Sequence, residues 1–202
     1  MTEDPYGELV PLGTHHPIWD RFFWVAPLVV IGTREVSGEF DLAPKHMACP
    51  LGWQNYFSFV CTPKHATYRN AQREKAFTVS YPRPDQVVMA ALAATPRCDD
   101  GSKATLQSLP TIPARLFEGV LLKDSYVYLE CELDRIIDDF GVNSIVIGKV
   151  LAAHVHPDAA RREDRDDQDV MRDCPVLAYL SPGRFAAIRD THSFPLPEGF
   201  SR

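Results

Sequence analysis

Residues 41–70 read Asp-Leu-Ala-Pro-Lys-His-Met-Ala-Cys-Pro-Leu-Gly-Trp-Gln-Asn-Tyr-Phe-Ser-Phe-Val-Cys-Thr-Pro-Lys-His-Ala-Thr-Tyr-Arg-Asn, and this stretch decides the fold. Its first residues end a strand, because Pro44 has no N–H to donate to a ladder. Residues 56–61 are rich in aromatic and β-branched side chains, which predicts a second strand. A helix is expected over residues 63–75, with a proline at its first position and Thr62 as its N-cap.

The start of this helix has features of a phosphate site. A helix N-terminus offers free N–H groups and the positive end of the helix dipole. Lys64 adds a positive charge there, and Thr67 adds a hydroxyl group. The other interpretation is an ordinary helix start beside a surface lysine, since the free N–H groups of a helix are commonly satisfied by water.

The residues on either side of this stretch predict further strands. Residues 25–34 are nearly all apolar, which is typical of a strand buried on both faces. Gly38 can adopt a positive φ in a turn at 36–39, and residues 40–43 then form the return strand. After the helix, residues 77–81 predict another strand. One helix among several short strands disfavours a parallel doubly wound sheet, in which helices alternate regularly with strands.

The second half of the chain is expected to hold a helix, a long loop and three strands. The helix covers 85–95, begins with an acidic residue and is followed by a proline. The segment 96–115 is longer than an ordinary loop between two secondary-structure elements, and it is interpreted as a lid. The strands are expected at 116–122, 125–137 and 144–155, with a turn at 138–141. Short antiparallel strands favour a closed or nearly closed barrel, although the pattern alone leaves a sandwich open.

Composition predicts one globular domain over residues 1–202, with 45% hydrophobic and 24% charged residues. We expect an extended arm at 1–21, a β-rich body at 22–190 and a surface tail at 191–202. The net charge of −6 and the absence of a long basic run disfavour nucleic acid or an anionic membrane as a partner. A phosphate ligand therefore needs a local positive site, for which the chain offers Lys45, Lys64, His65 and Arg69.

The cysteines and the first residues favour a reduced cytoplasmic protein. The five cysteines are widely spaced and form no Cys-x-x-Cys pair, so neither a disulfide framework nor a zinc site is expected. The first residues are acidic and lack the pattern of a signal peptide. No apolar run approaches the ~20 residues that span a bilayer.

Several motifs follow one another in a distinctive order: Leu-Ala-Pro-Lys at 42–45, Pro-Leu-Gly at 50–52, Cys-Thr-Pro-Lys-His-x-Thr-Tyr-Arg-Asn at 61–70 and Phe-Thr-Val-Ser-Tyr-Pro at 77–82. A closing segment, Cys-Pro-Val-Leu-Ala-Tyr-Leu-Ser-Pro-Gly-Arg-Phe, follows at 174–185. This order resembles the flavin reductase-like, flavoredoxin-like family. The resemblance implies a mainly β protein with a few helices: a split β-barrel of the FMN-binding type with Greek-key-like antiparallel strands. It also implies a homodimer with a flavin at each of two clefts between the subunits.

The resemblance further implies which residues bind the flavin. The ring edge is assigned to Pro44, Lys45 and His46, and the phosphate end to Cys61, Thr62, Lys64, Thr67 and Asn70. Three residues depart from the family pattern: His46, Cys61 and Ser80. A thiol donates only a weak hydrogen bond, so Cys61 is expected to offer its backbone N–H. In the plainer interpretation, the two lysines are ordinary surface residues and the asparagine bonds a nearby loop.

His154 is the catalytic residue that the resemblance implies, at a position near the nicotinamide. From the residues alone, His154 and His156 share one face of a strand. Such a pair is either plain surface or part of a metal site. No acidic or cysteine ligand stands at a fixed spacing to complete a metal site, so none is expected.

The function predicted in this way is that of an FMN-binding oxidoreductase, with FAD as a possible alternative. It transfers hydride from NADH or NADPH to the flavin and passes electrons to free flavin, oxygen or a partner oxygenase. The nicotinamide is expected to be a transient substrate, because the chain has no Gly-x-Gly-x-x-Gly motif. No Gly-x-Ser-x-Gly nucleophile motif is present either. Two alternatives stay open: an electron carrier that holds FMN without strong NAD(P)H activity, and a degenerate non-catalytic barrel.

Overall fold

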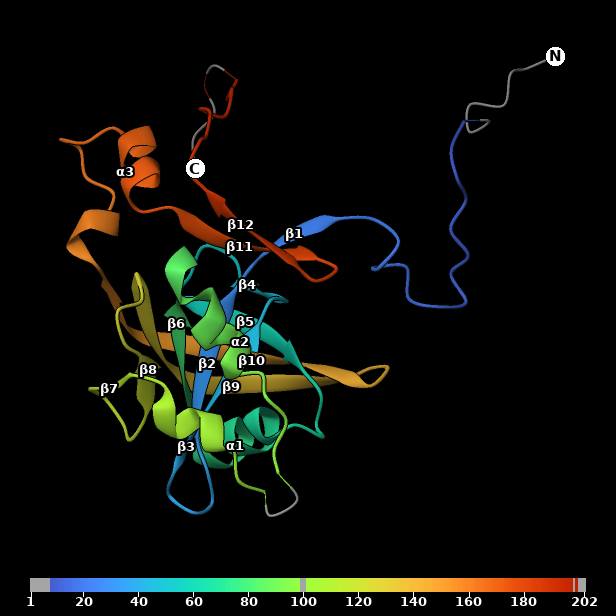
Figure 1. The fold of residues 1–202 in the computed structure, drawn as a ribbon, viewed down its shortest axis with the longest axis vertical. Helices are drawn as coiled ribbons and strands as arrows, with labels where there is room; N and C mark the ends of the chain where they lie inside the picture. Colours follow the sequence, from blue (N-terminus) through green and yellow to red (C-terminus); the bar gives the residue numbers. More distant parts are fainter. Residues whose placement is uncertain (1–7, 99–100, 198, 200–202) are drawn as a thin grey trace.

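A computed structural model describes residues 8–98, 101–197 and 199 (Figure 1). Its main feature is one antiparallel sheet of seven strands in the order β3-β2-β6-β9-β10-β5-β4, curled into a half-barrel. The strands are β2 (Val29–Arg34), β3 (Phe40–Lys45), β4 (Ala48–Pro50), β5 (Tyr56–Cys61), β6 (Ala76–Tyr81), β9 (Val127–Phe140) and β10 (Asn143–Val155). The prediction of a mainly β barrel is confirmed.

The two edge strands of this sheet, β3 and β4, are consecutive in the chain and are joined only by His46 and Met47. From Lys45, the last residue of β3, to Ala48, the first residue of β4, the chain takes three Cα–Cα steps of about 3.8 Å each. The ends of the two edge strands therefore lie within about 11 Å of each other. The carbonyl of Met47 accepts a hydrogen bond from the N–H of Val60 at 2.8 Å, which ties the link to β5. We call this crossing, residues 45–48, the seam of the barrel. Pro44 lies on the adjoining edge strand, where a residue without an N–H is tolerated.

The barrel interior holds the main core. Alternate residues of β5 face inward and are at most 3% exposed: Phe57, Phe59 and Cys61. Helix α1 (Ala66–Glu74) packs against β2, β3 and β6, at the lower end of the barrel in Figure 1. It contributes Tyr68 and Ala71 to the same core. Burial of a large apolar side chain stabilises by about 1.5–3 kcal/mol, so core packing fixes the position of this helix.

Gly148 of β10 lies against the ring of Phe77. A Cβ atom at Gly148 would be 2.5 and 2.6 Å from two carbons of that ring and 3.0 Å from the carbonyl oxygen of Glu132. The ring is buried and packs edge-on against Phe59, with 5.2 Å between the centroids, so it has no room to move. We expect Gly148→Ala to lower the free energy of unfolding in urea by about 1–3 kcal/mol.

The matched control for this variant is Gly13→Ala, because nothing lies within 4 Å of a Cβ atom at that position. It should change the free energy of unfolding by less than about 0.5 kcal/mol. Equal stability of the two variants would contradict the packing of Phe77 described above.

A second layer covers the outer face of β2, β6 and β9. It consists of the hairpin β7 (Thr111–Pro113) and β8 (Val120–Leu122), with η1 (Pro84–Gln86), α2 (Val87–Leu92) and η2 (Ala104–Ser108). A separate apolar cluster holds it to the sheet: Val30, Leu42, Ala90, Ala93, Leu109 and Leu122. The N–H of Leu122 also donates to the Ser80 hydroxyl at 3.0 Å. Ser80, which departs from the family pattern, thus anchors this layer.

A three-stranded antiparallel sheet lies at the opposite end from α1 (Figure 1). It contains β1 (Trp24–Pro27), β11 (Val176–Ser181) and β12 (Arg184–Ile188). Two short helices precede β11 in the chain, η3 (Pro157–Ala159) and α3 (Asp167–Asp173). The arm before β1 runs away from the barrel.

Several predicted boundaries are wrong. The strand expected at 25–34 is divided into β1 and β2, which pair in different sheets. The helix expected from residue 63 begins at Ala66, because residues 62–65 form a turn. The strand expected at 116–122 is reduced to β8, and the helix expected at 85–95 to η1 and α2.

The predicted position of the turn, at 138–141, is also wrong. Strand β9 continues to Phe140, and the turn falls at residues 141–142. Gly141 takes the positive φ that the turn needs, and Asp139 adopts φ 72° while still within the strand. Strands β4, β7, β11 and β12 were not expected at all.

Parts of the predicted arm, lid and tail lie outside the described residues, at 1–7, 99–100, 198 and 200–202. Within the described ranges, no helix is both long enough and apolar enough to cross a membrane. The organisation as a single domain stays a prediction.

Candidate functional site

A cavity of about 390 Å³ lies beside the seam, and we call it the basic cavity. Its walls are the end of β3, the turn before α1 with the first residues of that helix, and residues 93–97 with Lys103. Five lysine and arginine residues line it: Lys45, Lys64, Arg69, Arg97 and Lys103. Among the described residues that line it, the one carboxylate is Asp41. In a protein with a net charge of −6, this is a local concentration of positive charge.

The turn before α1 leaves the helix N-terminus open. The Thr62 hydroxyl accepts from the N–H of Lys64 at 3.4 Å, and the Thr62 carbonyl accepts from the N–H of His65 at 3.0 Å. His65 is the N-cap, but its side chain makes no capping hydrogen bond. The first N–H groups of α1 are therefore available to a ligand in the cavity. Thr62 shapes the turn instead of capping the helix.

Two side chains of α1 complete this wall. Thr67 lines the cavity from a buried position on the helix. The guanidinium of Arg69 donates to the carbonyls of Lys64, at 2.5 Å, and Pro63, at 3.4 Å. Arg69 thus fixes the turn while it contributes charge to the cavity.

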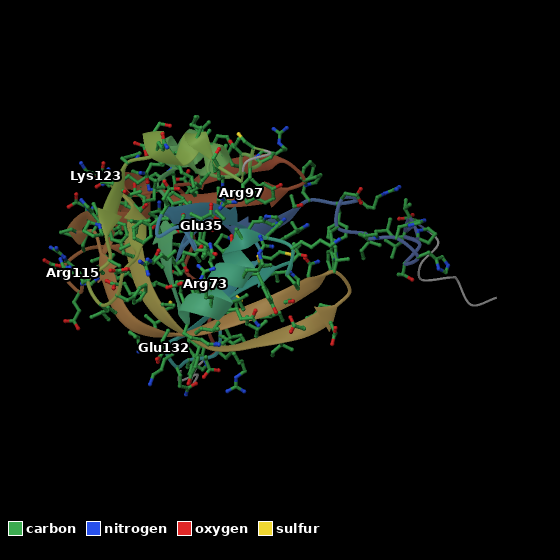
Figure 2. All side chains as sticks on the ribbon, turned by 90° about the horizontal axis from the view of Figure 1, so that it is seen from below. Glu35, Arg73, Arg97, Arg115, Lys123 and Glu132 are labelled. Atoms are coloured by element: carbon green, nitrogen blue, oxygen red, sulfur yellow. The ribbon has the colours of Figure 1, made fainter. Side chains whose placement is uncertain are left out.

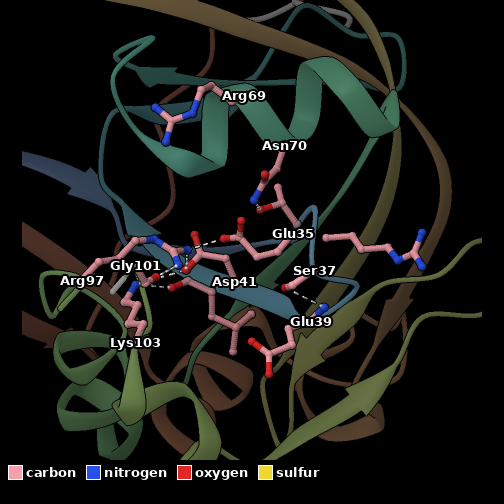
Figure 3. Close-up of polar contacts among 12 residues, drawn as sticks. Glu35, Ser37, Glu39, Asp41, Arg69, Asn70, Arg97, Gly101 and Lys103 are labelled. Carbon is pink, nitrogen blue, oxygen red and sulfur yellow. Dashed lines mark hydrogen bonds and ion pairs between the residues drawn. The ribbon is translucent and has the colours of Figure 1, made fainter. Parts of the chain in front are cut away.

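The segment expected to be a lid supplies the opposite wall. The Lys103 ammonium group donates to Asp41 at 3.3 Å and to the carbonyls of Leu42 and Ala93 at 3.0 and 2.5 Å. Arg97 pairs with Asp41 at 3.2 Å and also with Glu35. Figure 3 shows these side chains meeting beside β3. The bonds hold this part of 96–115 against the barrel as a wall, and its movement as a lid stays a prediction.

The pKa values of two histidines reflect the positive charge. The pKa of His65 is lowered by burial and then by the charges of Lys45 and Arg69, which outweigh the opposing effect of Asp41. The pKa of His46 is lowered by burial and then by Lys45. Both imidazoles are therefore neutral at pH 7.

These lowered pKa values make stability depend on pH. Below pH 6.5 the two histidines bind protons more readily in the unfolded chain than in the folded one, so stability is lost as the pH falls. We expect the melting temperature to drop between about pH 7 and about pH 5.5. His46→Gln combined with His65→Gln should reduce that drop in a thermal melt monitored by circular dichroism. An identical pH dependence in the variant would contradict the assignment.

His46 itself lies at the seam among aromatic rings. Its ring centroid is 4.5 Å from that of Tyr179 on β11 and 5.7 Å from that of Trp24 on β1. The Tyr179 hydroxyl accepts from the N–H of Gly183 at 3.0 Å, which fixes the ring within its hairpin. The seam thus joins the basic cavity to an aromatic surface.

The structure brings together four of the eight predicted cofactor-binding residues, since Pro44, Lys45, Lys64 and Thr67 all line the basic cavity. Cys61 instead packs in the barrel core. Asn70 is buried, and its amide donates to the Thr33 hydroxyl at 3.2 Å (Figure 3).

His154 lies elsewhere. It lines a different cavity, where its Nε2 is 3.4 Å from the Arg115 guanidinium. His156 lines the same cavity and accepts from the N–H of Asp158 at 3.4 Å through its Nδ1. In the described part of the chain, no group of three metal-ligating side chains includes them.

The family model described as "Flavin reductase like domain" matches residues 24–187. The chain belongs to the flavin reductase-like family. Its fold is the split barrel of that family, as the resemblance implied. No curated protein matches the sequence.

Solved structures of this flavin reductase-like fold are similar at low sequence identity. A flavoredoxin from Methanosarcina acetivorans has a TM-score of 0.75 and 15% identity, over 95% of this chain and 97% of its own. Nitrilotriacetate monooxygenase component B from Bacillus cereus has a TM-score of 0.74 and 18% identity, over 85% and 88%. An NADH:FAD oxidoreductase from Streptomyces globisporus has a TM-score of 0.65 and 14% identity, over 82% and 87%.

Proposed function

We propose that this protein is a flavin reductase that binds FMN and transfers hydride from NADH or NADPH to it. Electrons then pass to free flavin, oxygen or a partner oxygenase. The observation that supports this most directly is the basic cavity at the open N-terminus of α1. Membership of the flavin reductase-like family and the similarity to an NADH:FAD oxidoreductase and a monooxygenase component support the reaction class.

The basic cavity fits the phosphate of FMN. A phosphate monoester carries a charge of about −1.5 to −2 and three acceptor oxygens. Free N–H groups at the start of α1, the Thr67 hydroxyl and the ammonium groups of Lys45 and Lys64 are matching donors. In this proposal Pro44, Lys45 and His46 would border the ring through their backbone, while the ammonium group of Lys45 would reach the phosphate.

The residues of this chain bind and orient the flavin. Lys45 and Lys64 neutralise the phosphate, and Tyr179 and Trp24 hold the His46 ring beside the seam. A bound flavin supplies the two-electron redox chemistry, so the protein needs no acid–base pair. A catalytic part for His154 near the nicotinamide stays a prediction, and His154 lines a different cavity from the phosphate site proposed here.

The test is the visible spectrum of the purified protein, recorded anaerobically before and after NADH or NADPH is added. Flavin absorption bands that bleach within seconds are the expected result. A colourless protein that FMN and FAD cannot reconstitute would contradict the proposal and leave the degenerate barrel.

A second candidate function is electron transfer without strong NAD(P)H activity. The similarity to a flavoredoxin favours it. Flavin bands that persist with NADH and NADPH but bleach with dithionite would identify this function instead.

We also propose a homodimer in the cytoplasm. Large apolar side chains are exposed on the arm, around the seam and on the small sheet: Trp19, Phe22, Phe23, Trp53 and Phe185. The cysteines of the described residues are all unpaired, which suits a reducing compartment. Light scattering during gel filtration should give twice the chain mass of 22.7 kDa, and a monomer would contradict the dimer.

A further inference from the structure

A second cavity, of about 260 Å³, lies under the β7–β8 hairpin, and we call it the outer cavity. None of its lining residues lines the basic cavity. Figure 2 shows Arg115, at its rim, well separated from Arg97 of the basic cavity. The outer cavity is therefore independent of the proposed flavin site.

The outer cavity contains a buried carboxylate that is only half satisfied. Glu130 of β9 is 1% exposed and lines the cavity. Its Oε2 accepts from the N–H groups of Arg115 and Leu116 at 3.0 and 2.7 Å. Its Oε1 is also buried and has no hydrogen-bond partner among the described residues. Leaving such an oxygen unpaired is costly, so a ligand that donates a hydrogen bond to it would be stabilised in this cavity.

Three other residues of the outer cavity, Arg83, Arg115 and Tyr128, can donate hydrogen bonds. The Nε of Arg83 is buried without a partner in the described structure, and its guanidinium stacks over Tyr126 with 5.2 Å to the ring centroid. The Tyr128 hydroxyl accepts from the N–H of Ser125 at 2.9 Å, which leaves its own proton to donate. Arg115 stands beside His154 at the rim. A ligand that presents an acceptor group as well as a donor therefore matches these residues.

Charge balance narrows the class of ligand. Two arginines, Arg83 and Arg115, and two carboxylate residues, Asp124 and Glu130, line the outer cavity. A net charge added to a cavity whose charges already balance would be left unpaired, so a ligand without net charge, such as a zwitterion, is favoured over an anion or a cation. The remaining wall is apolar, with Ile112, Leu121 and Val155 among its residues, and accommodates an aliphatic body.

We propose that the outer cavity binds a small aliphatic aminocarboxylate. Its ammonium group donates to Oε1 of Glu130, and its carboxylate accepts from Arg115 and Tyr128. Nothing in this proposal depends on flavin binding or on reductase activity, so the two proposals can fail separately.

The test is isothermal titration calorimetry of the full chain with L-leucine and with γ-aminobutyrate. At least one should bind with a Kd of about 1 mM or tighter. Isocaproate, which is leucine without its amino group, and isopentylamine, which is leucine without its carboxylate, should bind at least about tenfold more weakly. Absence of binding by both aminocarboxylates, or equal binding by isocaproate or isopentylamine, would overturn the proposal.

Two variants locate the site. Arg115→Ala keeps the main-chain N–H that donates to Glu130. It should weaken the binding of the aminocarboxylate by about tenfold or more. Glu130→Gln, if this variant folds, should weaken the binding of the aminocarboxylate by a similar factor. Arg135→Ala is the control, because that arginine is exposed and pairs with Asp134. Equal affinity of the Arg115 variant and wild type would overturn the proposal, whether or not the Glu130 variant folds.

Discussion

Replacing Lys45 and Lys64 together with alanine should weaken FMN binding by about 100-fold. Both lysines line the basic cavity, where they flank the open end of α1. A hydrogen bond to a charged group contributes about 1.5–3 kcal/mol, and the lower value applies here because Lys64 is exposed. Two such losses of about 1.5 kcal/mol amount to roughly two factors of ten in Kd. Quenching of flavin fluorescence at fixed ionic strength measures the change.

The control for this variant is Lys123→Ala with Lys149→Ala. Both of these lysines are exposed and lie outside the basic cavity, so the net charge changes equally. We expect the control to bind FMN within about twofold of wild type, since screened charges at a distance contribute little. Equal weakening in both double variants would mean that net charge, not the cavity, governs binding.

The second large effect concerns stability. Lys103→Met should lower the free energy of unfolding by about 2–4 kcal/mol, because two carbonyls lose their donor while Asp41 keeps its ion pair with Arg97. Its side chain is 7% exposed, and its ammonium group serves Asp41 and two backbone carbonyls at once. Methionine fills the space of the stem but leaves those acceptors with fewer donors in a buried site. Urea denaturation followed by tryptophan fluorescence measures the loss.

Lys123→Met is the matched control, because Lys123 is exposed. It should change the free energy of unfolding by less than about 0.5 kcal/mol. A loss below about 1 kcal/mol for Lys103→Met would contradict the anchoring role of this lysine.

Much of the barrel could be predicted from the sequence, because local patterns encode it. The alternation along β9 and the aromatic run of β5 both mark strands with one face in the core. The division of residues 25–34 into β1 and β2 was missed, because a continuous apolar run does not show which sheet each half joins. The C-terminal hairpin was missed as secondary structure, although its motif was noticed.

The site was predictable where its parts are neighbours in the chain. Lys64 and Thr67 stand beside one helix start, so a local signal points to them. Arg97 and Lys103 were missed, because they reach the cavity through contacts with Asp41, far away in the sequence. Cys61 is a converse case: its position as the last residue of β5 matched the motif, but strand alternation turns its thiol into the core.

The most direct test of the central claim compares the affinity of the wild-type protein for FMN and for riboflavin. The two ligands differ only by the phosphate group that the basic cavity is proposed to hold. We expect FMN to bind at least about 100-fold more tightly, and the difference to narrow when Lys45 and Lys64 are replaced. Equal affinity for FMN and riboflavin would contradict the assignment of the basic cavity to the flavin phosphate.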